Sequence, residues 1–407
     1  MINKAFILAI LFIFTPLVLV FKWVSSSGAS IISPFTNISA IVFSLYLLLR
    51  PGGLGVRQNR LLINLFVLLL ATYLINYCVT SYVSDKWLIN SVGFIFIFYS
   101  VVILIVKCKD EFLMSVSKLI KSSIGIVMLV LTIIAVVRRL SNDGMLLTGA
   151  DNNLISYLIY PLNIQKHYLG VLFNLVVVWN IVFWRSLTYK RRCLFVVFLM
   201  ISFPLWNGIR TSVLSLSLLT VYWMLAKRVW LRKAMFLVVP FVALILWMKW
   251  ESVIGFVSKH FDRLPSYRLA LDISMNNNPF GLGNGGYHIF VETFNSSIFS
   301  KFGKAYMVGA KFWTGPESDM VYFIASFGIL SLVFFGFYVY LLINSMDILR
   351  SNEVLLIERF LSVMSVLFIF TGISSYNAGM LIWWLYMAGG FAVILRHRKC
   401  ARKKIYE

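Results

Sequence analysis

The sequence has few charged residues and few cysteines. Charged residues occupy 13% of its 407 positions, and only 15 residues are acidic. This scarcity excludes an ordinary soluble globular protein, in which about a quarter of the residues carry charge. The four cysteines form no C-x-x-C pair and no disulfide framework, and the four histidines are dispersed. The sequence therefore predicts no metal and no other cofactor.

The carboxylates also lack D-x-D clustering, the pattern that holds a divalent ion together with a nucleotide-sugar diphosphate. This absence argues against a glycosyltransferase that uses a cytosolic nucleotide-sugar donor.

Apolar residues dominate instead, at 60% of the chain with a mean hydropathy of +0.87. A transmembrane helix needs about 20 apolar residues. The apolar runs are continuous and do not alternate, which favours helices over a β-barrel. The sequence thus predicts an all-α integral membrane protein with about 12 transmembrane helices, a single polytopic domain over residues 1–407. The predicted spans lie near 5–21, 31–49, 61–80, 88–106, 122–137, 167–184, 193–206, 211–226, 234–250, 319–343, 361–375 and 378–395.

The net charge of +22 is distributed unevenly. In a soluble protein it would suggest a nucleic-acid partner. With the N-terminus inside, however, most Lys and Arg residues fall in the inner connections and the C-terminal tail, as the positive-inside rule requires. We therefore interpret the charge as a topology signal, with both termini cytoplasmic and no nucleic-acid partner. The run 5–21 is expected to be a retained span rather than a signal peptide, because no A-x-A-like site follows it.

Two outer segments interrupt the short connections. The first is a loop over 138–166, and the second is a large loop over 251–318 between the predicted helices 9 and 10. Within the large loop, apolar residues at helical spacing predict one or two short helices, with Leu264, Tyr267, Leu271 and Ile273 on their apolar face. Because polar residues are sparse elsewhere, we expect the chemistry of the protein to lie in this loop.

Three arginines are candidate phosphate ligands. Arg210 follows a tight turn at the outer end of a helical pair, where it either anchors the helix at the interface or binds phosphate with its planar fork. Arg263 and Arg268 share a helix face with Asp272. That face is either a solvated, self-paired surface or a cationic seat for an anionic lipid headgroup.

The segment 276–288 is rich in glycine and contains G-x-G-x-x-G at Gly281, Gly283 and Gly286. No strand precedes it and no βαβ unit surrounds it, so the dinucleotide-binding interpretation is excluded. We expect a bend whose backbone N–H groups are exposed to a phosphate or a sugar.

The sequence Glu317-Ser318-Asp319 stands at the head of the predicted span 319–343, with Trp313 nearby. Carboxylates at a helix N-terminus are often no more than caps that compensate the helix dipole, and Ser318 or Asp319 is a candidate cap. Glu317 or Asp319 is also a candidate general base for deprotonating a hydroxyl.

These motifs occur in a characteristic order: N-G-x-R-T, then R-x4-R, then N-P-F-G-L-G-N-G, then P-E-S-D before a span with G-I-L. Over about residues 190–345 the chain resembles the O-antigen ligase/polymerase superfamily, which includes Wzy-type polymerases. The resemblance implies a GT-C-like, metal-independent glycosyltransferase of the bacterial inner membrane, acting at its periplasmic face. It further implies an undecaprenyl-diphosphate-linked oligosaccharide donor among membrane lipids, and a chain-length-regulating copolymerase as partner.

On this resemblance, Arg210, Arg263 and Arg268 would bind the donor diphosphate, with Arg210 also acting in catalysis beside Glu317 or Asp319. Asn284, Tyr287, His288 and Trp313 would line the glycan path. Ligases of the family carry H-[NSQ]-x9-G, whereas this chain has Glu317-Ser318 and then Gly328. The glutamate favours a polymerase of O-antigen or a similar polysaccharide. An O-antigen ligase that transfers glycan to lipid A-core, and a polysaccharide flippase or transporter, are the alternatives.

Overall fold

A computed structural model describes most of the helical part of the chain. The described residues are 56–80, 85–140, 166–202, 210–228, 264–284, 286–287, 290, 307–308, 311–312, 318–351, 354–374 and 381–406. The spans predicted near 5–21, 31–49 and 234–250 lie outside these residues, as does most of the first predicted loop, 138–166.

The described chain is almost entirely helical. Its longer helices are α4 (Val56–Val79), α5 (Asp85–Lys107), α6 (Asp110–Leu140), α8 (Lys166–Val182), α9 (Tyr189–Ser202), α10 (Arg210–Lys227), α17 (Ser331–Arg350), α18 (Leu356–Ser374) and α19 (Leu381–Tyr406). The shorter elements are α13 (Leu264–Asp272), α16 (Asp319–Phe327), the single turns η3 (Trp184–Ser186), η5 (Ile273–Asn277) and η7 (Gly328–Leu330), and a hairpin of β1 (Met307–Val308) and β2 (Lys311–Phe312).

The chain is an all-α membrane protein. Four stretches are long and apolar enough to cross a bilayer: Asn59–Val79, Asp110–Ile133, Asp319–Arg350 and Leu356–Ile373. Three shorter apolar helices accompany them, at Ser91–Lys107, Leu172–Val182 and Ser212–Lys227. Their bounds agree with the predicted spans within about five residues, with two exceptions: α6 begins at Asp110 rather than near 122, and the stretch that begins at Asp319 extends to Arg350 rather than to 343. The total of twelve spans stays a prediction.

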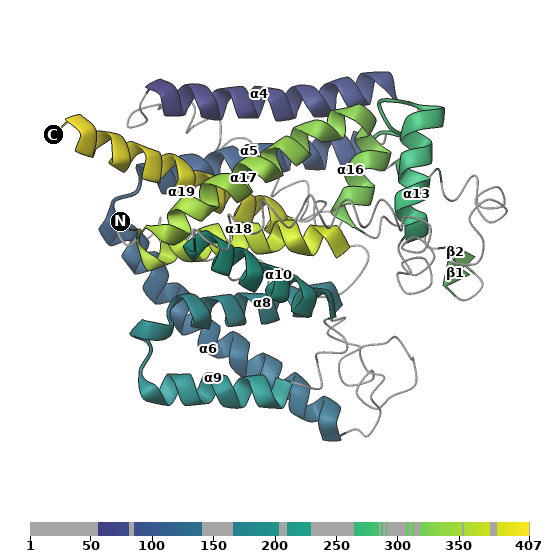
Figure 1. Cartoon of the computed structure of the whole chain (residues 1–407). Helices are drawn as coiled ribbons and strands as arrows, with labels where there is room; N and C mark the ends of the chain where they lie inside the picture. The colour runs from purple at the N-terminus through teal and green to yellow at the C-terminus, as the bar shows by residue number, and fades with distance from the viewer. Residues whose placement is uncertain are drawn as a thin grey trace.

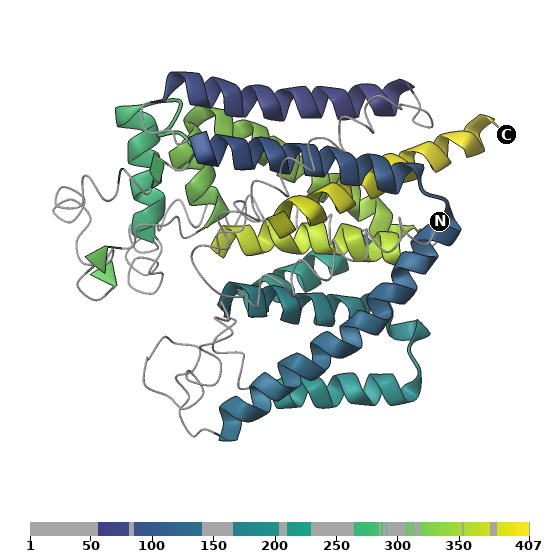
Figure 2. The same cartoon turned by 180° about the vertical axis from the view of Figure 1, so that it is seen from behind.

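The long helices run along a common direction and reverse at two ends of the bundle (Figures 1 and 2). α19 forms the centre and packs against α5, α17 and α18. Its buried Trp384 and Phe391 contact Phe98 of α5. α18 and α19 approach closely at Gly390, where an added Cβ would lie 2.2 Å from Ser365 Oγ. Small residues permit such close helix contacts within membranes.

At one end of the bundle, arginines connect neighbouring helices. Arg396 of α19 pairs with Asp110 of α6 and, at 2.6 Å from its Nε, with Glu358 of α18. Arg350 of α17 donates its Nε–H to the carbonyl of Ala226 at 2.5 Å. We call this the arginine end. The opposite end, which α13 crosses (Figure 1), is called the α13 end.

The predicted single span 319–343 is wrong in one respect, because it is broken. α16 ends at Phe327, η7 follows, and α17 continues in a different direction (Figure 1). Gly328 adopts a φ of 53°, and the N–H of Ile329 donates to the carbonyl of Pro279 at 2.8 Å. The large loop therefore supplies the acceptor that a continuous helix would have supplied itself.

Candidate functional site

α13 lies across the end of the bundle and packs against α16 (Figure 1). The contact is a small apolar core made of Leu269, Ala270, Ile273, Leu282, Tyr287, Val321 and Ala325. The predicted short helix in the large loop is confirmed. Its predicted apolar face is only partly right, since Ile273 is buried but Leu271 is 44% exposed.

Tyr267 joins three elements at the head of α16. Its hydroxyl donates to the carbonyl of Ile373 at the end of α18, at 2.5 Å, and accepts from Ser318 Oγ at 3.1 Å. Ser318 Oγ in turn accepts from the N–H of Val321 at 3.2 Å, and is therefore the N-cap of α16. Of the two predicted caps, the structure selects Ser318.

Asp319 occupies the first position of α16 and is fully buried. Its carboxylate lies against Gly372 of α18, where an added Cβ would be 2.4 Å from Oδ2. The Tyr338 hydroxyl of α17 lies close to the same carboxylate. Contact of this carboxylate with a substrate would require the buried arrangement to open, and the predicted role of Asp319 as base stays a prediction. Its place in the first helical turn favours a negative charge and suits a positioning role.

The glycine-rich segment holds the broken span together. The N–H of Leu282 donates to the carbonyl of Ala325 at 2.8 Å, and the N–H of Gly283 donates to that of Ser326 at 3.0 Å. Gly281 and Gly283 have φ values of 80° and 95°, which only glycine adopts readily. The prediction of a bend with N–H groups exposed to phosphate is wrong here, because these N–H groups bond the last turn of α16.

Asn76 of α4 holds the other side of this segment. Its Nδ2 donates to the carbonyls of Phe280 at 3.0 Å and Ser326 at 2.8 Å, and its Oδ1 accepts from the N–H of Asn284 at 3.1 Å. One side chain thus satisfies three backbone groups from two distant segments. Our sequence interpretation missed Asn76, although an amide within an apolar span is itself a signal of a specific role.

Asn284 continues the network. Its Nδ2 donates to Ser91 Oγ of α5 at 2.7 Å, and its Oδ1 accepts from the Tyr322 hydroxyl of α16. The Tyr73 hydroxyl of α4 lies close to both Ser91 and Tyr322. Asn284 and Tyr287 are each 2% exposed. Contact of either residue with glycan would require this buried arrangement to open, and their predicted role in glycan binding stays a prediction.

Replacing Asn76 by leucine is expected to destabilise the protein by about 2 kcal/mol or more. The Phe280 carbonyl and the Asn284 N–H lose their partner, whereas the Ser326 carbonyl keeps the N–H of Gly283. Each buried backbone group left without a partner costs about 1–3 kcal/mol. Asn64→Leu is the control, since Asn64 is exposed on the same helix and should change stability by less than about 0.5 kcal/mol. Thermal unfolding in detergent measures both. Equal melting temperatures for the two variants would contradict the role given to Asn76.

The remaining predicted residues are only partly described. Arg210 is the first residue of α10, and Arg268 is part of α13. Arg263, His288, Trp313 and Glu317 lie outside the described residues. α10 and α16 both pack against α18, and α13 packs against α16. The helices that carry Arg210, Arg268 and Asp319 therefore belong to one contiguous group.

Among the described residues, no group of three or more His, Cys, Asp and Glu side chains is arranged to hold a metal ion. Comparisons of the chain with protein-family models, with curated proteins and with solved structures find no match. The family resemblance of the motifs therefore stays a prediction, and the chemistry of the site is inferred from its own residues.

Proposed function

We propose that this protein is a lipid-donor glycosyltransferase that polymerises O-antigen or a similar surface polysaccharide. The observation that carries the proposal is the docking of the large polar loop on the head of the broken span. α13, which contains Arg268, packs on α16, whose first residue, Asp319, is two positions after Glu317 in the sequence.

In this proposal the donor is an undecaprenyl-diphosphate-linked glycan. Arg210, Arg263 and Arg268 bind the diphosphate and stabilise the charge that develops on it as it leaves. An acceptor hydroxyl of the next lipid-linked repeat unit attacks the anomeric carbon. The bond between that carbon and the diphosphate oxygen breaks, and the hydroxyl proton passes to Glu317. The products are the elongated lipid-linked glycan and free undecaprenyl diphosphate.

Asp319 then has a supporting part. Being fully buried against Gly372, it fixes the start of α16 relative to α18. Glu317 is two positions earlier and outside that helix. We therefore assign Glu317 as the base and Asp319 as a positioning residue. The positive charges of the arginines can neutralise a diphosphate leaving group and so take the part that a metal ion plays in other glycosyltransferases.

The membrane arrangement belongs to the same proposal. Arg396, Arg350 and Lys227 gather at the end opposite α13. By the positive-inside rule that end is cytoplasmic and the α13 end periplasmic. The full chain would then have about twelve helices in a GT-C-like arrangement in a bacterial inner membrane, with both termini inside and a chain-length-regulating copolymerase as partner.

Deletion of the gene in the producing bacterium, followed by complementation, tests the class of function. We expect surface lipopolysaccharide with a single repeat unit on lipid A-core, and recovery of long chains when the gene is restored. Gel electrophoresis of the extracted lipopolysaccharide measures this. Core without any repeat unit would identify a ligase instead, and accumulation of lipid-linked units on the cytoplasmic side would identify a flippase.

A further inference from the structure

Two adjacent cavities lie between α8, α9 and α10 and extend to the arginine end. The first has a volume of about 610 Å³ and is lined mainly by apolar side chains of these three helices. The second has a volume of about 1020 Å³ and reaches η3, α17 and α18. Ile181, Trp223 and Lys227 line both cavities, so the two are direct neighbours.

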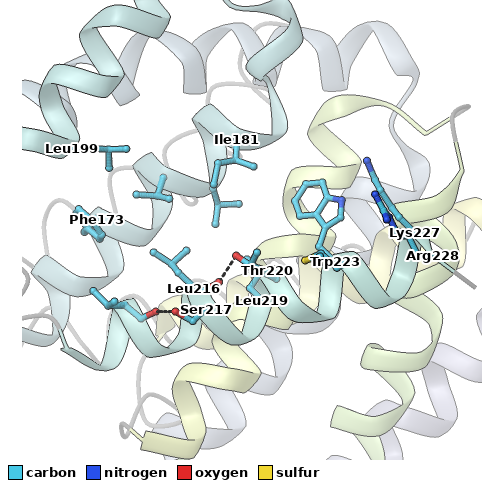
Figure 3. Close-up of a pocket in the computed structure, with 14 residues that line it drawn as sticks. Phe173, Ile181, Leu199, Leu216, Ser217, Leu219, Thr220, Trp223, Lys227 and Arg228 are labelled. Carbon is cyan, nitrogen blue, oxygen red and sulfur yellow. Dashed lines mark hydrogen bonds between the residues drawn. The ribbon is translucent and has the colours of Figure 1, made fainter. Parts of the chain in front are cut away.

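The first cavity has an apolar body and a basic mouth. Figure 3 shows Phe173, Leu199 and Leu216 along its length, with Trp223, Lys227 and Arg228 toward one end. Ile181 and Met224 are 48% and 51% exposed on the helices that form its walls. Within a bilayer such surfaces face lipid, so an acyl chain can enter from the side.

The second cavity is strongly basic. Its described lining contains Arg185, Lys227, Arg350 and Arg359 and no acidic residue. Within the described part of the chain, one carboxylate pairs with this group, Asp347 at 3.6 Å from Arg350. The charges of Arg185 and Arg359 repel each other. Such a cluster stores repulsion that a bound anion would relieve.

Two of these guanidinium groups also have unused donors. Arg350 Nη2 and Arg359 Nε are buried and have no hydrogen-bond partner among the described residues. Buried charged donors without an acceptor are costly, and phosphate oxygens are suitable acceptors for arginine.

The tryptophans beside the second cavity indicate how deep its basic residues lie in the bilayer. Trp184 and Trp223 line the second cavity, and Lys227 Nζ lies 5.6 Å from the centroid of the Trp223 ring. Tryptophan and basic side chains together are typical of the headgroup level of a bilayer. Basic pockets between transmembrane helices are known sites for anionic lipid headgroups.

We propose that the two cavities bind a phospholipid with an anionic headgroup, its phosphate held by Arg185, Lys227 and Arg359 and its acyl chains lying along the apolar cavity. The site lies at the opposite end of the bundle from α13 and does not depend on the proposed glycosyltransferase activity. It would tie α8, α9 and α10 to α17 and α18 through the lipid.

Native mass spectrometry of the full-length protein in nonionic detergent tests this site with phosphatidylglycerol as the probe and phosphatidylcholine as the neutral comparison. The wild type should retain phosphatidylglycerol in preference. Arg185→Gln and Lys227→Gln should each lower its retention about fivefold, as expected for one Lys or Arg contact with an anionic lipid. Both side chains are exposed, which favours correct folding of the variants.

Two matched controls test whether the effects depend on the cavities. Lys190→Gln controls for the loss of any surface charge, and Val221→Trp controls for the addition of a large side chain anywhere on α10. Lys190→Gln removes an exposed charge of α9 that does not line either cavity, and should leave retention unchanged. Thr220→Trp fills the apolar cavity and should lower retention about tenfold, as if about two methylene groups were excluded. Val221→Trp places the same bulk outside both cavities and should have no effect.

The lipid site is overturned if phosphatidylcholine is retained as well as phosphatidylglycerol. It is also overturned if Arg185→Gln and Lys227→Gln retain as much phosphatidylglycerol as Lys190→Gln does, and Thr220→Trp as much as Val221→Trp. It is also overturned if glycerol 1-phosphate, which lacks acyl chains, displaces the lipid at equal concentration, because the cavity would then be a soluble-phosphate site. If neither lipid is retained, the lipid site is likewise overturned, because a segment of this chain would then fill the cavities.

Discussion

Glu317→Gln is expected to reduce polymer formation by about 10²–10⁴-fold, the usual contribution of a general base. Glutamine keeps the size of the side chain but cannot accept the proton of the acceptor hydroxyl. The measurement is the rate of chain extension on purified lipid-linked repeat units, together with the length distribution of surface polysaccharide in complemented cells.

Asp319→Asn is the informative comparison for this prediction. Because Asp319 is fully buried beside Gly372, its replacement should lower the melting temperature and reduce the rate less than Glu317→Gln does. Unchanged long chains in the Glu317→Gln strain would remove Glu317 from the mechanism. If Asp319→Asn abolished the reaction at an unchanged melting temperature, the two carboxylates would exchange roles.

Gly328→Ala is expected to destabilise the protein by about 3 kcal/mol or more. An added Cβ would lie 2.0 Å from the carbonyl oxygen of Pro279 and 2.6 Å from its carbon, and both atoms belong to the backbone. The φ of 53° adds strain for any residue with a side chain. Left-handed strain costs about 1–3 kcal/mol and overpacking a further 1–3 kcal/mol. Thermal unfolding in detergent measures the change.

Gly336→Ala provides the matched control, eight residues further along the same broken span. No heavy atom lies within 4 Å of the Cβ that it would add, and Gly336 is exposed on α17. Alanine is about 1 kcal/mol better than glycine within a helix, so this variant should be neutral or stabilised. A melting temperature of Gly328→Ala equal to that of Gly336→Ala would show that the break does not depend on the Pro279 contact.

The apolar runs predicted the described helices well because bilayer thickness fixes the length of a span. α4, α5, α8 and α10 lie within a few residues of their predicted positions. α6 is longer than predicted, since its first turns are amphipathic. Leu113, Val116 and Ile120 are buried on one face there, while Glu111, Ser115 and Lys118 are among the exposed residues, a pattern that a purely apolar criterion does not detect.

The prediction of the candidate site was less complete. Helical spacing located α13, and the Ser318 cap follows from local chemistry. The glycine segment was misinterpreted, because the same left-handed glycines serve an exposed phosphate loop and a buried turn equally well. Whether the turn is exposed or buried depends on the residues that pack against it. Here the Ser326 carbonyl and the Asn76 side chain pack against it and bond its backbone.

The sequence alone determined that this chain is a helical membrane protein, where most of its helices lie and which segment interrupts them. These properties depend on composition and on periodicity within about 20 residues. The tertiary structure decided that the interrupted span breaks at Gly328 and that Asp319 is buried. It also decided that Asn76 bonds Phe280, 204 positions away, and Ser326, 250 positions away. Hydrogen-bond partners at such separations meet only when the helices pack, so no local pattern records them.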